Sequence, residues 1–403
     1  MQMKIAYLLS RFPSQYQSYV AREILAMKMR GYETKIFSLK PPIDFGHKDS
    51  APLLKDLYYK PFVASWCVWQ SNLKLFFNRP AFYLSLVWYV LRNNFMALMI
   101  LLKALSVFPK TVHYAYIMRQ MGVTHLHAHW STLPAFCAIV CSKILGIDYS
   151  MTCHAVDIFG PNNMLKEKLI KAKFVVTCAG HNKQHLIKCY PGMDADKIFI
   201  NYHGFDLEKV KRSKNARTEP LEIISVGRIE ASKGYLYLLK ACAALKRDGN
   251  RAFHCTIIGD GPDRKYILRL MQRFDLSDVL TLAGALPYEE VIDYYENASI
   301  SVLAAVSEFH RGIPNVVAES MAMEVPVITT PLPALAEIIE DGVNGILVPE
   351  KNHEALGDAI FTLIKSKNLR DSIAKKGRKT IENVFDMRKT YKELSDIFEK
   401  HLW

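Results

Sequence analysis

The feature of this sequence that most limits its possible folds is a regular alternation of short apolar runs with longer amphipathic segments, which occurs in two series. The short runs are typical of buried strands and the longer segments of helices, the pattern of parallel-sheet α/β domains. A polar, basic stretch, EKVKRSKNARTEP at 208–220, separates the two series and is typical of a linker. We therefore predict two doubly wound domains, 1–207 and 221–386, followed by an amphipathic helical stretch at 387–403.

The pattern also predicts the individual elements. In the first domain we expect strands at 4–10, 32–39, 123–129, 148–154, 174–179 and 198–202, and a helix through 20–30. In the second domain we expect strands at 222–228, 253–261, 279–284, 300–305 and 325–330, alternating with helices at 233–248, 262–274, 287–297 and 315–323. Open sheets of this kind bind ligands at the carboxyl ends of their strands, and a cleft between two such domains is the default ligand site.

Composition excludes several classes of protein. Half of the 403 residues are hydrophobic and 23% are charged, which is the balance of a globular protein and not of a disordered or fibrous one. The eight cysteines form no CxxC pair and lie mostly in apolar runs, as expected for buried thiols in a reducing compartment. The first residues, MQMKIAYLLSRFPS, lack the long apolar run and small-residue cleavage site of a signal peptide. We therefore expect a cytoplasmic protein.

Positive charge is concentrated in the first half of the chain. Residues 1–210 contain 25 Lys and Arg against 12 Asp and Glu, whereas residues 211–403 contain 27 of each. No acidic residue occurs between Asp56 and Asp148. A one-sided basic surface of this kind favours an anionic partner.

The segment 57–120 suggests which anionic partner this is. It contains fifteen aromatic residues, among them Trp66, Trp69 and Trp88, interleaved with Lys and Arg, and no apolar run in it is long enough to span a bilayer. Aromatic and cationic residues around short apolar helices favour a segment that lies on an anionic membrane surface. The alternative is that these helices only pack on the domain core or on each other. Nucleic acid is disfavoured because no recognition motif accompanies the charge.

Two cations lie close together in SVGRIEASKG (225–234). Arg228 follows a predicted strand, Lys233 lies at or near the start of the next helix, and Gly227 and Gly234 stand beside them. Cations placed in this way can bind a diphosphate at a helix N-terminus, although an isolated pair is more often found on an ordinary surface loop. In GDGP (259–262), Gly259 and Gly261 would let the backbone approach a base or ribose; alone, this signal is no stronger than a turn.

A third pattern is RGIPNVVAES (311–320). Gly312, Ile313, Pro314 and Asn315 form a loop that leads into a predicted helix carrying Glu319. Backbone N–H groups at such a helix start can bind hydroxyl or phosphate oxygens, and Glu319 could accept hydrogen bonds from two ribose hydroxyls. A glutamate near a helix start is otherwise explained by a favourable contact with the helix dipole.

The run HLHAHW (125–130) places His125, His127 and His129 on one face of a predicted strand. An HxH pair is also a metal-ligand pattern, which would indicate a metal-dependent hydrolase. The later strand ends, however, carry phosphate-binding patterns and no further His and Asp ligands. We therefore expect no metal site, with His129 lining the ligand cleft and the other two histidines in the core or behind the residues that line the cleft.

These motifs together carry a family resemblance. In order, VGRIEASKG, GDGP, GIPNVVAES and EDGVNGILVP (340–349) resemble the donor-binding domain of the retaining GT-B glycosyltransferases of family four. In the first domain, SRFPSQYQSYVAREI, HLHAHW, TCHAVDIF and NYHGFDLEKV resemble the bacterial branch that builds exopolysaccharide, capsule and lipopolysaccharide. The resemblance implies two Rossmann-like domains facing each other across a cleft, with residues 387–403 crossing back to the first.

The resemblance also implies roles for individual residues. Arg228 and Lys233 would bind the donor diphosphate and stabilise its departure, and Glu319, the second Glu of a Glu-x7-Glu motif, would bind the ribose. His154 would contact the sugar near the reacting carbon. Arg11, His129 and Asp157 would lie on the acceptor side, and the donor loops would comprise Gly227, Gly259, Gly261, Glu308, Arg311, Gly312, Ile313, Pro314 and Asn315.

One departure from the family pattern concerns the first Glu of that motif, where this chain has Arg311. An arginine cannot accept the hydrogen bonds of sugar hydroxyls, but it can pair with a carboxylate or phosphate. Three explanations stay open: Glu308 substitutes for the missing Glu, the donor carries an anionic sugar, or the protein has lost donor handling. The loop after the first strand, which contains Arg11, also lacks the double Gly of many relatives.

The resemblance therefore implies a retaining, metal-independent glycosyltransferase of the hexosyltransferase type. It would use a UDP- or GDP-linked nucleotide sugar and no other cofactor, and would transfer the sugar to a lipid-linked or other glycan acceptor at the inner face of the cytoplasmic membrane. The alternatives are a non-catalytic glycan- or membrane-binding subunit of a synthase complex and, with less support, a GT-B-like nucleotide-sugar epimerase.

Overall fold

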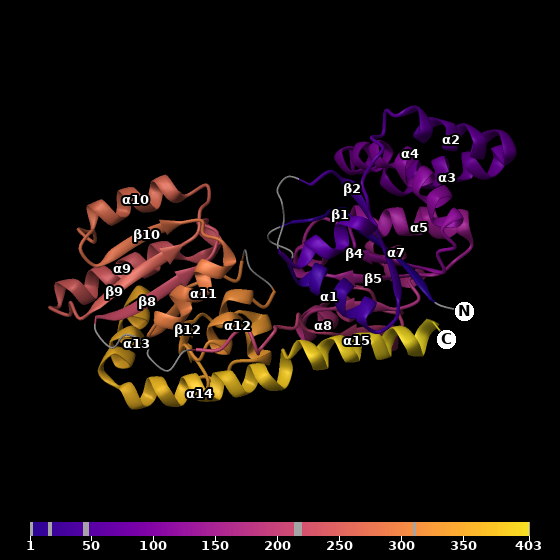
Figure 1. Ribbon diagram of the computed structural model, residues 1–403. Helices are drawn as coiled ribbons and strands as arrows, with labels where there is room; N and C mark the ends of the chain where they lie inside the picture. The colour runs from indigo at the N-terminus through magenta and orange to yellow at the C-terminus, as the bar shows by residue number, and fades with distance from the viewer. Residues whose placement is uncertain (1–2, 15–17, 43–47, 213–219, 309–311, 403) are drawn as a thin grey trace. The chain divides into compact units, whose positions relative to one another are not determined.

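A computed structural model describes residues 3–14, 18–42, 48–212, 220–308 and 312–402. Contacts divide the chain into an N-terminal unit, residues 1–203 with 391–403, and a C-terminal unit, residues 204–390. Each unit contains one parallel sheet with helices on both faces (Figure 1). The predicted α/β class is confirmed.

The N-terminal sheet has the strand order β3-β2-β1-β4-β5-β6-β7, with every pair parallel. Its strands are β1 (Lys4–Arg11), β2 (Glu33–Lys40), β3 (Leu57–Tyr58), β4 (His125–His129), β5 (Tyr149–Cys153), β6 (Val175–Thr177) and β7 (Ile198–Ile200). Its helices are α1 (Ser18–Met29), α2 (Trp66–Asn78), α3 (Pro80–Asn94), α4 (Leu98–Gln120), α5 (Leu133–Leu145), α6 (Ala155–Phe159), α7 (Leu165–Lys171) and α8 (Gly180–Cys189).

Alternation along the buried strands builds two cores in this unit. Ala6 and Leu8 of β1 pack with side chains of α4 and α5 on one face of the sheet. Tyr7 and the other intervening residues of β1 pack with α1 on the opposite face. The last helix, α15 (Met387–Leu402), adds Phe398 to this second core, which explains why both faces of the central strands are apolar.

The C-terminal sheet has the order β10-β9-β8-β11-β12-β13, again all parallel. Its strands are β8 (Leu221–Val226), β9 (Phe253–Ile258), β10 (Leu280–Gly284), β11 (Ile300–Leu303), β12 (Val327–Thr329) and β13 (Ile346–Leu347). Its helices are α9 (Tyr235–Arg247), α10 (Arg264–Arg273), α11 (Tyr288–Asn297), α12 (Asn315–Ala322), α13 (His353–Lys365) and α14 (Lys367–Val384).

The structure describes only part of the predicted linker at 208–220. Residues up to Arg212 pack on the C-terminal unit, where the Arg212 guanidinium donates to the carbonyl oxygens of Ala298, Glu296 and Glu324. Residues 213–219 lie outside the described residues. The described start of this segment is therefore held to the C-terminal unit by Arg212, and the linker stays a prediction for the remainder.

The observed elements differ from the predicted ones at two points. The helix predicted from residue 233 begins at Tyr235, because Gly234 adopts a left-handed conformation (φ 68°) after a short 3₁₀ helix at Ala231–Lys233. The two-residue strands β3 and β13 were not predicted. They are too short to show a period and form only because a neighbouring strand offers an unpaired edge.

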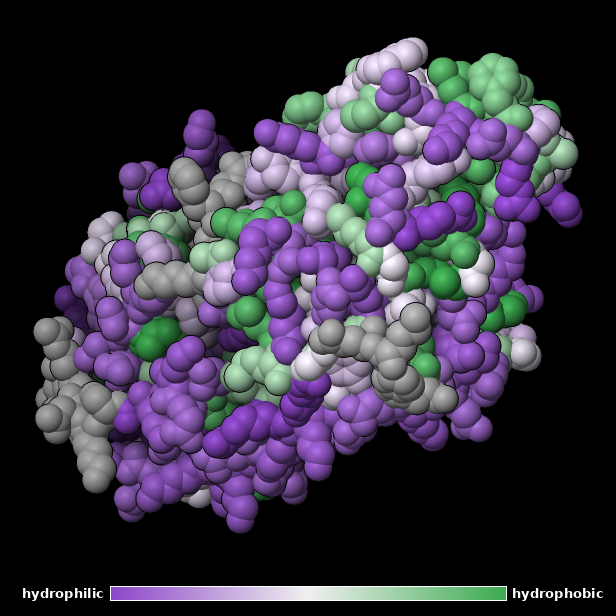
Figure 2. Space-filling model, turned by 45° about the vertical axis from the view of Figure 1, so that its right-hand side comes forward, coloured by the Kyte–Doolittle hydropathy of each residue, from purple (hydrophilic) through white to green (hydrophobic). Residues whose placement is uncertain are grey.

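The segment 57–120 forms a layer of three helices, α2, α3 and α4, over α5. Of the twenty large hydrophobic side chains that are exposed among the described residues, twelve lie within 62–102. Trp66 is 67% exposed and Trp88 is 63% exposed. Figure 2 shows hydrophobic side chains at this end of the N-terminal unit, at the upper right, with hydrophilic ones beside them. No helix in the described part of the chain is both long and apolar enough to cross a bilayer.

Lys110, which the sequence places among the cations of this segment, does not reach the surface. Its ammonium group is buried and donates to the carbonyl oxygens of Leu39 and Tyr59 at 3.0 and 2.7 Å. Burial lowers the pKa of Lys110 to about 8. This lysine therefore joins α4 to the sheet and takes no part in an exposed basic face.

Candidate active site

The predicted site residues gather at the carboxyl edges of the two sheets. In the N-terminal sheet the strand order reverses between β1 and β4, and in the C-terminal sheet between β8 and β11. Loops diverge at such a reversal and leave room for a ligand. Each unit therefore places its candidate residues where this fold class binds small molecules.

In the C-terminal unit, the loop after β8 carries the two predicted cations. The Arg228 side chain is exposed, and its Nε lies 3.5 Å from an oxygen of Glu230. The Lys233 stem lies against Gly227, so that a Cβ at Gly227 would come within 3.7 Å of it. Burial lowers the pKa of Lys233, and the charge of Glu230 partly opposes this effect. An anion bound here would replace the water that the Lys233 ammonium has lost.

Three loops are joined at this edge by backbone hydrogen bonds. Ile229 N donates to Asp260 O at 3.0 Å, and Val306 N donates to Ser232 O at 3.0 Å. Gly259 has a φ of 143°, and a Cβ there would lie 2.0 Å from Gly227 O. A Cβ at Gly261 would lie 2.3 Å from Ile229 O. In the structure, the close approach that these two glycines permit is to the chain's own 227–229 loop.

Helix α12 begins at Asn315, directly after Gly312, Ile313 and the buried Pro314. Glu319 lies one turn into this helix and is half-buried. Tyr295 of α11 donates its hydroxyl to Glu319 Oε2 at 3.4 Å. The predicted ribose ligand is thus held by a tyrosine that the sequence did not single out.

The two residues weighed for the first position of the Glu-x7-Glu motif are placed differently. Glu308 belongs to the residues that the structure describes, and it is exposed. Arg311 lies outside the described residues, so all three explanations of its presence stay open.

In the N-terminal unit, His154 follows β5 at the start of the short helix α6. Its backbone N–H donates to Asp157 Oδ1 at 2.7 Å, and its ring stacks on His203 with centroids 5.3 Å apart. Burial, with the neighbouring His203 and His129, holds the pKa of His154 well below its usual range. The His154 imidazole is therefore neutral at physiological pH.

Asp157, predicted on the acceptor side, is only 3% exposed. Its carboxylate accepts from the backbone N–H groups of Ser131 and His154. Burial raises the pKa of Asp157 to about 6, although these N–H donors oppose the rise. In the structure the hydrogen bonds of this carboxylate connect the β4–α5 loop to the start of α6.

His129 is also fully buried. Its Nε2 lies 3.1 Å from Glu23 Oε1, and its Nδ1 lies 3.4 Å from His154 Nε2. Trp130, the next residue, has a φ of 75°, a strained conformation for a bulky side chain. His129 thus contacts His154 from within the protein, and Trp130 turns the chain at the strand end.

The other two histidines of the run lie in the core, as predicted. His125 and His127 are buried and both contact the Ser150 hydroxyl at 2.8 Å. Arg11, the last residue of β1, is half-buried and donates to the carbonyl oxygen of Pro41.

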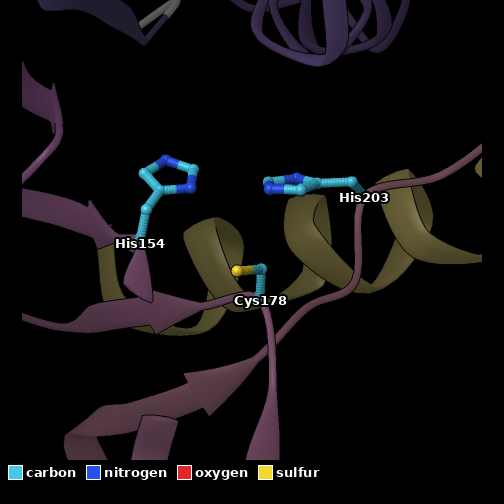
Figure 3. Close-up of side chains that lie close together, drawn as sticks. All are labelled: His154, Cys178 and His203. Atoms are coloured by element: carbon cyan, nitrogen blue, oxygen red, sulfur yellow. The ribbon is translucent and has the colours of Figure 1, made fainter. Parts of the chain in front are cut away.

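His203 and Cys178 were not predicted as site residues. His203 follows β7, Cys178 follows β6, and both side chains point toward His154 (Figure 3). Tyr19 stacks on His203 with centroids 4.0 Å apart, and burial lowers the pKa of His203 to about 3. The available signal was positional, since Cys178 lies near the end of the predicted strand 174–179 and His203 directly follows the predicted strand 198–202.

Among the residues that the structure describes, two groups of side chains have donor atoms suited to a transition metal. One comprises His154, Cys178 and His203, and the other Glu23, His127 and His129; within each group the donor atoms lie within 4.8 Å of one another. Neutral imidazole and thiolate are ligands that zinc prefers. The expectation of a metal-independent reaction stays a prediction.

Comparison with known proteins agrees with this architecture. The sequence model of the family "Glycosyl transferases group 1" matches residues 206–380. The colanic acid biosynthesis glycosyltransferase WcaL of Escherichia coli is 31% identical over 214 residues, 52% of each chain. The amylovoran biosynthesis glycosyltransferase AmsK of Erwinia amylovora is 30% identical over 213 residues, also 52% of each. The chain thus aligns with about half the length of these curated relatives.

Solved structures match over the whole chain. A glycosyltransferase from Rickettsia africae superposes with a TM-score of 0.73 at 19% identity, covering 100% of this chain and 99% of its own. Anabaena Alr3699/HepE, solved in complex with UDP, gives a TM-score of 0.72 at 13% identity, covering 99% and 100%. At these identities the match establishes the fold. The match to the group 1 glycosyltransferase model is thus confined to residues 206–380, less than half of the chain, and the two α/β units have the GT-B fold.

Proposed function

We propose that the protein is a glycosyltransferase of cell-surface polysaccharide biosynthesis that transfers a sugar from a nucleotide-sugar donor to a lipid-linked glycan. The observation that carries the proposal is the Arg228–Lys233 loop, which lies within the family-matched region and at the strand-order reversal of the C-terminal sheet. Relatives named for colanic acid and amylovoran biosynthesis support the pathway class.

The donor diphosphate would bind to the loop between β8 and α9. Lys233 supplies a poorly hydrated ammonium group and Arg228 an exposed guanidinium on the same loop. Both charges would oppose the negative charge that develops as the nucleoside diphosphate leaves. This arrangement would supply the electrostatic part of the catalysis without a metal ion. Glu319, held by Tyr295, would accept hydrogen bonds from the ribose hydroxyls.

On the acceptor side, His154 would contact the transferred sugar as a neutral imidazole. His129 and Asp157 would act as positioning residues, because each contacts His154 or its backbone and is buried. We propose that transfer proceeds with retention, by front-face substitution in which the leaving phosphate helps to deprotonate the acceptor hydroxyl.

The α2–α4 layer would bring the enzyme to its acceptor. Exposed tryptophans at positions 66, 69 and 88 lie within a segment that contains no acidic residue between 57 and 147. Aromatic and cationic side chains of this kind bind in the headgroup region of anionic bilayers. We propose peripheral binding at the cytoplasmic face of the membrane.

The proposal is tested by incubating the purified protein with neutral and uronic nucleotide sugars and lipid extract in EDTA, and measuring released nucleoside diphosphate. Release with one donor that needs the lipid extract supports the transferase, and a uronic donor would explain Arg311. Lys265→Ala, which removes an exposed cation of α10, is the control for Lys233→Ala. Nucleotide binding without release with any donor would instead favour the non-catalytic subunit, and interconversion of the donor sugar without acceptor would favour the epimerase.

A further inference from the structure

A pocket of about 360 Å³ lies in the N-terminal unit, apart from the candidate donor loops. Its walls are one side of α4, the start of α5 and the loop 161–164 that precedes α7. All of these elements belong to the same unit.

The pocket is cationic. Lys40, Lys103 and Lys168 line it, and none of its lining residues is acidic. Lys168 is only 4% exposed and donates to Asn162 Oδ1 and Asn163 O, both at 2.8 Å. Among the described residues no carboxylate lies within ion-pair distance of any of these three ammonium groups. The hydrogen-bond partners of Lys168 are neutral, and the nearby Asp157 carboxylate only partly offsets the cost of burying its ammonium group, so an anion in this pocket would be favourable.

The remaining lining combines polar residues, such as Asn94, Ser106 and Thr132, with an apolar part. Ile100, Val107, Phe136 and Met164 contribute side chains to it. The same helix α4 carries exposed Leu98, Met99 and Leu102 beside the pocket. A ligand suited to this lining therefore has an anionic group joined to an apolar chain, and the apolar chain would continue along α4.

The pocket is connected to the acceptor side of the candidate active site by hydrogen bonds. Asn162 donates to the Ser131 hydroxyl at 2.8 Å and to the carbonyl oxygen of Asp157 at 2.8 Å. Asp157 in turn accepts from the His154 backbone N–H at 2.7 Å. Hydrogen bonds therefore lead from Lys168 through Asn162 and Asp157 to His154, and they connect an anion held by Lys168 to the acceptor side of the site.

We propose that this pocket binds the diphosphate of a lipid-linked acceptor, with the lipid chain along α4 and the attached sugar directed toward His154. The inference rests on the proposed function for the role of the ligand. It commits to a lipid diphosphate over a phospholipid headgroup because three lysines line the same pocket and none of its lining residues is acidic. Burial lowers the pKa of Lys168 to about 8, and a bound diphosphate would raise it again.

The test measures binding without donor or turnover. Farnesyl diphosphate, inorganic pyrophosphate and farnesol are titrated into the full chain in detergent, with isothermal calorimetry as the readout. We expect farnesyl diphosphate to bind more tightly than pyrophosphate, and farnesol not to bind. The double variant Lys40→Ala/Lys103→Ala changes two exposed residues, so it should fold, and it should weaken farnesyl diphosphate binding about tenfold or more.

Lys60→Ala/Lys74→Ala is the matched control, because it removes two exposed cations of the same segment that do not line the pocket. Equal weakening by the control pair, or unchanged binding in the pocket pair, would overturn the proposal. Displacement of farnesyl diphosphate by phosphatidylglycerol vesicles would assign the pocket to headgroups and also overturn it. Because no transfer is measured, a failure here is distinguishable from a failure of the proposed function.

Discussion

Replacing Lys233 by methionine separates a binding role from a structural one. The substitution keeps the length of the side chain, which lies against Gly227, and removes only the ammonium charge. Burial lowers the pKa of this lysine in the folded protein, so its charged form destabilises the fold. We therefore expect Lys233→Met to unfold at the same temperature as the wild type or higher at pH 7.

The sign of the pH dependence follows from the same shift. Between the lowered pKa of the folded state and the ordinary value of 10.5, the unfolded chain binds more protons, so the wild type gains stability as the pH rises. The methionine variant lacks this contribution. Its stability advantage should therefore shrink as the pH approaches 10.5, and thermal melts across pH 7 to 10 measure it.

The effect on function should be opposite and large. Removing a donor that stabilises developing charge costs about 10²- to 10³-fold in rate, or about 3 to 4 kcal/mol. A nucleoside diphosphate at 100 times its Kd should stabilise the wild type by about 2.7 kcal/mol, and the variant by much less. Normal turnover, or an unchanged nucleotide-induced shift in Tm, would refute the assignment of Lys233 to the donor site. A loss of Tm without nucleotide would show that the lysine is structural.

Four further predictions follow from the geometry. Glu319→Gln should raise KM for the donor about tenfold or more with a smaller change in kcat, measured by initial rates, because one acceptor for ribose hydroxyls is lost. The Asp157 carboxyl has a pKa of about 6 against 3.8 unfolded, so it lowers stability by about 3 kcal/mol as the pH rises through that window; Asp157→Asn should remove this dependence from the unfolding free energy. EDTA should leave transfer unchanged. Trp66→Ser/Trp88→Ser should release the protein from anionic vesicles in co-sedimentation, since both rings are exposed.

Each of these has a contrary outcome. A Glu319 variant with normal KM would remove the ribose assignment, and an unchanged pH profile in Asp157→Asn would show that another group titrates. Activity that is lost in EDTA and restored by Zn²⁺ would contradict the metal-independent reaction and indicate a metal at His154, Cys178 and His203. Cys178→Ser would then test this site. Co-sedimentation unchanged by the tryptophan variant, with Phe361→Ser on α13 as control, would contradict the membrane surface.

Much of the fold follows from periodicity alone. The strands around 4–10 and 222–228 and the helix at 315–323 were predicted within a few residues, because each is long enough to show its period. Shorter or interrupted elements were missed or misplaced. The helix at 233 began late because one glycine took a left-handed conformation, which no hydrophobic pattern encodes.

The sequence predicted the positions of the candidate residues in the fold better than their burial. Arg228, Lys233 and Glu319 stand at strand or helix ends, where the order of elements alone places them at one edge of a sheet. His129 and Asp157 were expected to face the acceptor, yet they are buried and contact His154 or its backbone. Burial depends on what the rest of the chain packs over a strand end, and this cannot be read from the residues on either side.

The sequence by itself therefore determined two parallel sheets, the strand ends that carry polar side chains, and the basic aromatic segment, because these depend on local period and composition. Only the tertiary structure decided which charges lose their water. Nothing in the residues beside Lys110, Lys168 or Lys233 marks them as desolvated, but packing in the folded protein removes water from each ammonium group and lowers its pKa. Long-range contacts also brought Cys178 and His203 beside His154. Segments distant in sequence remove water from the lysine ammonium groups and bring the side chains around His154 together, so both effects exist only in the folded protein.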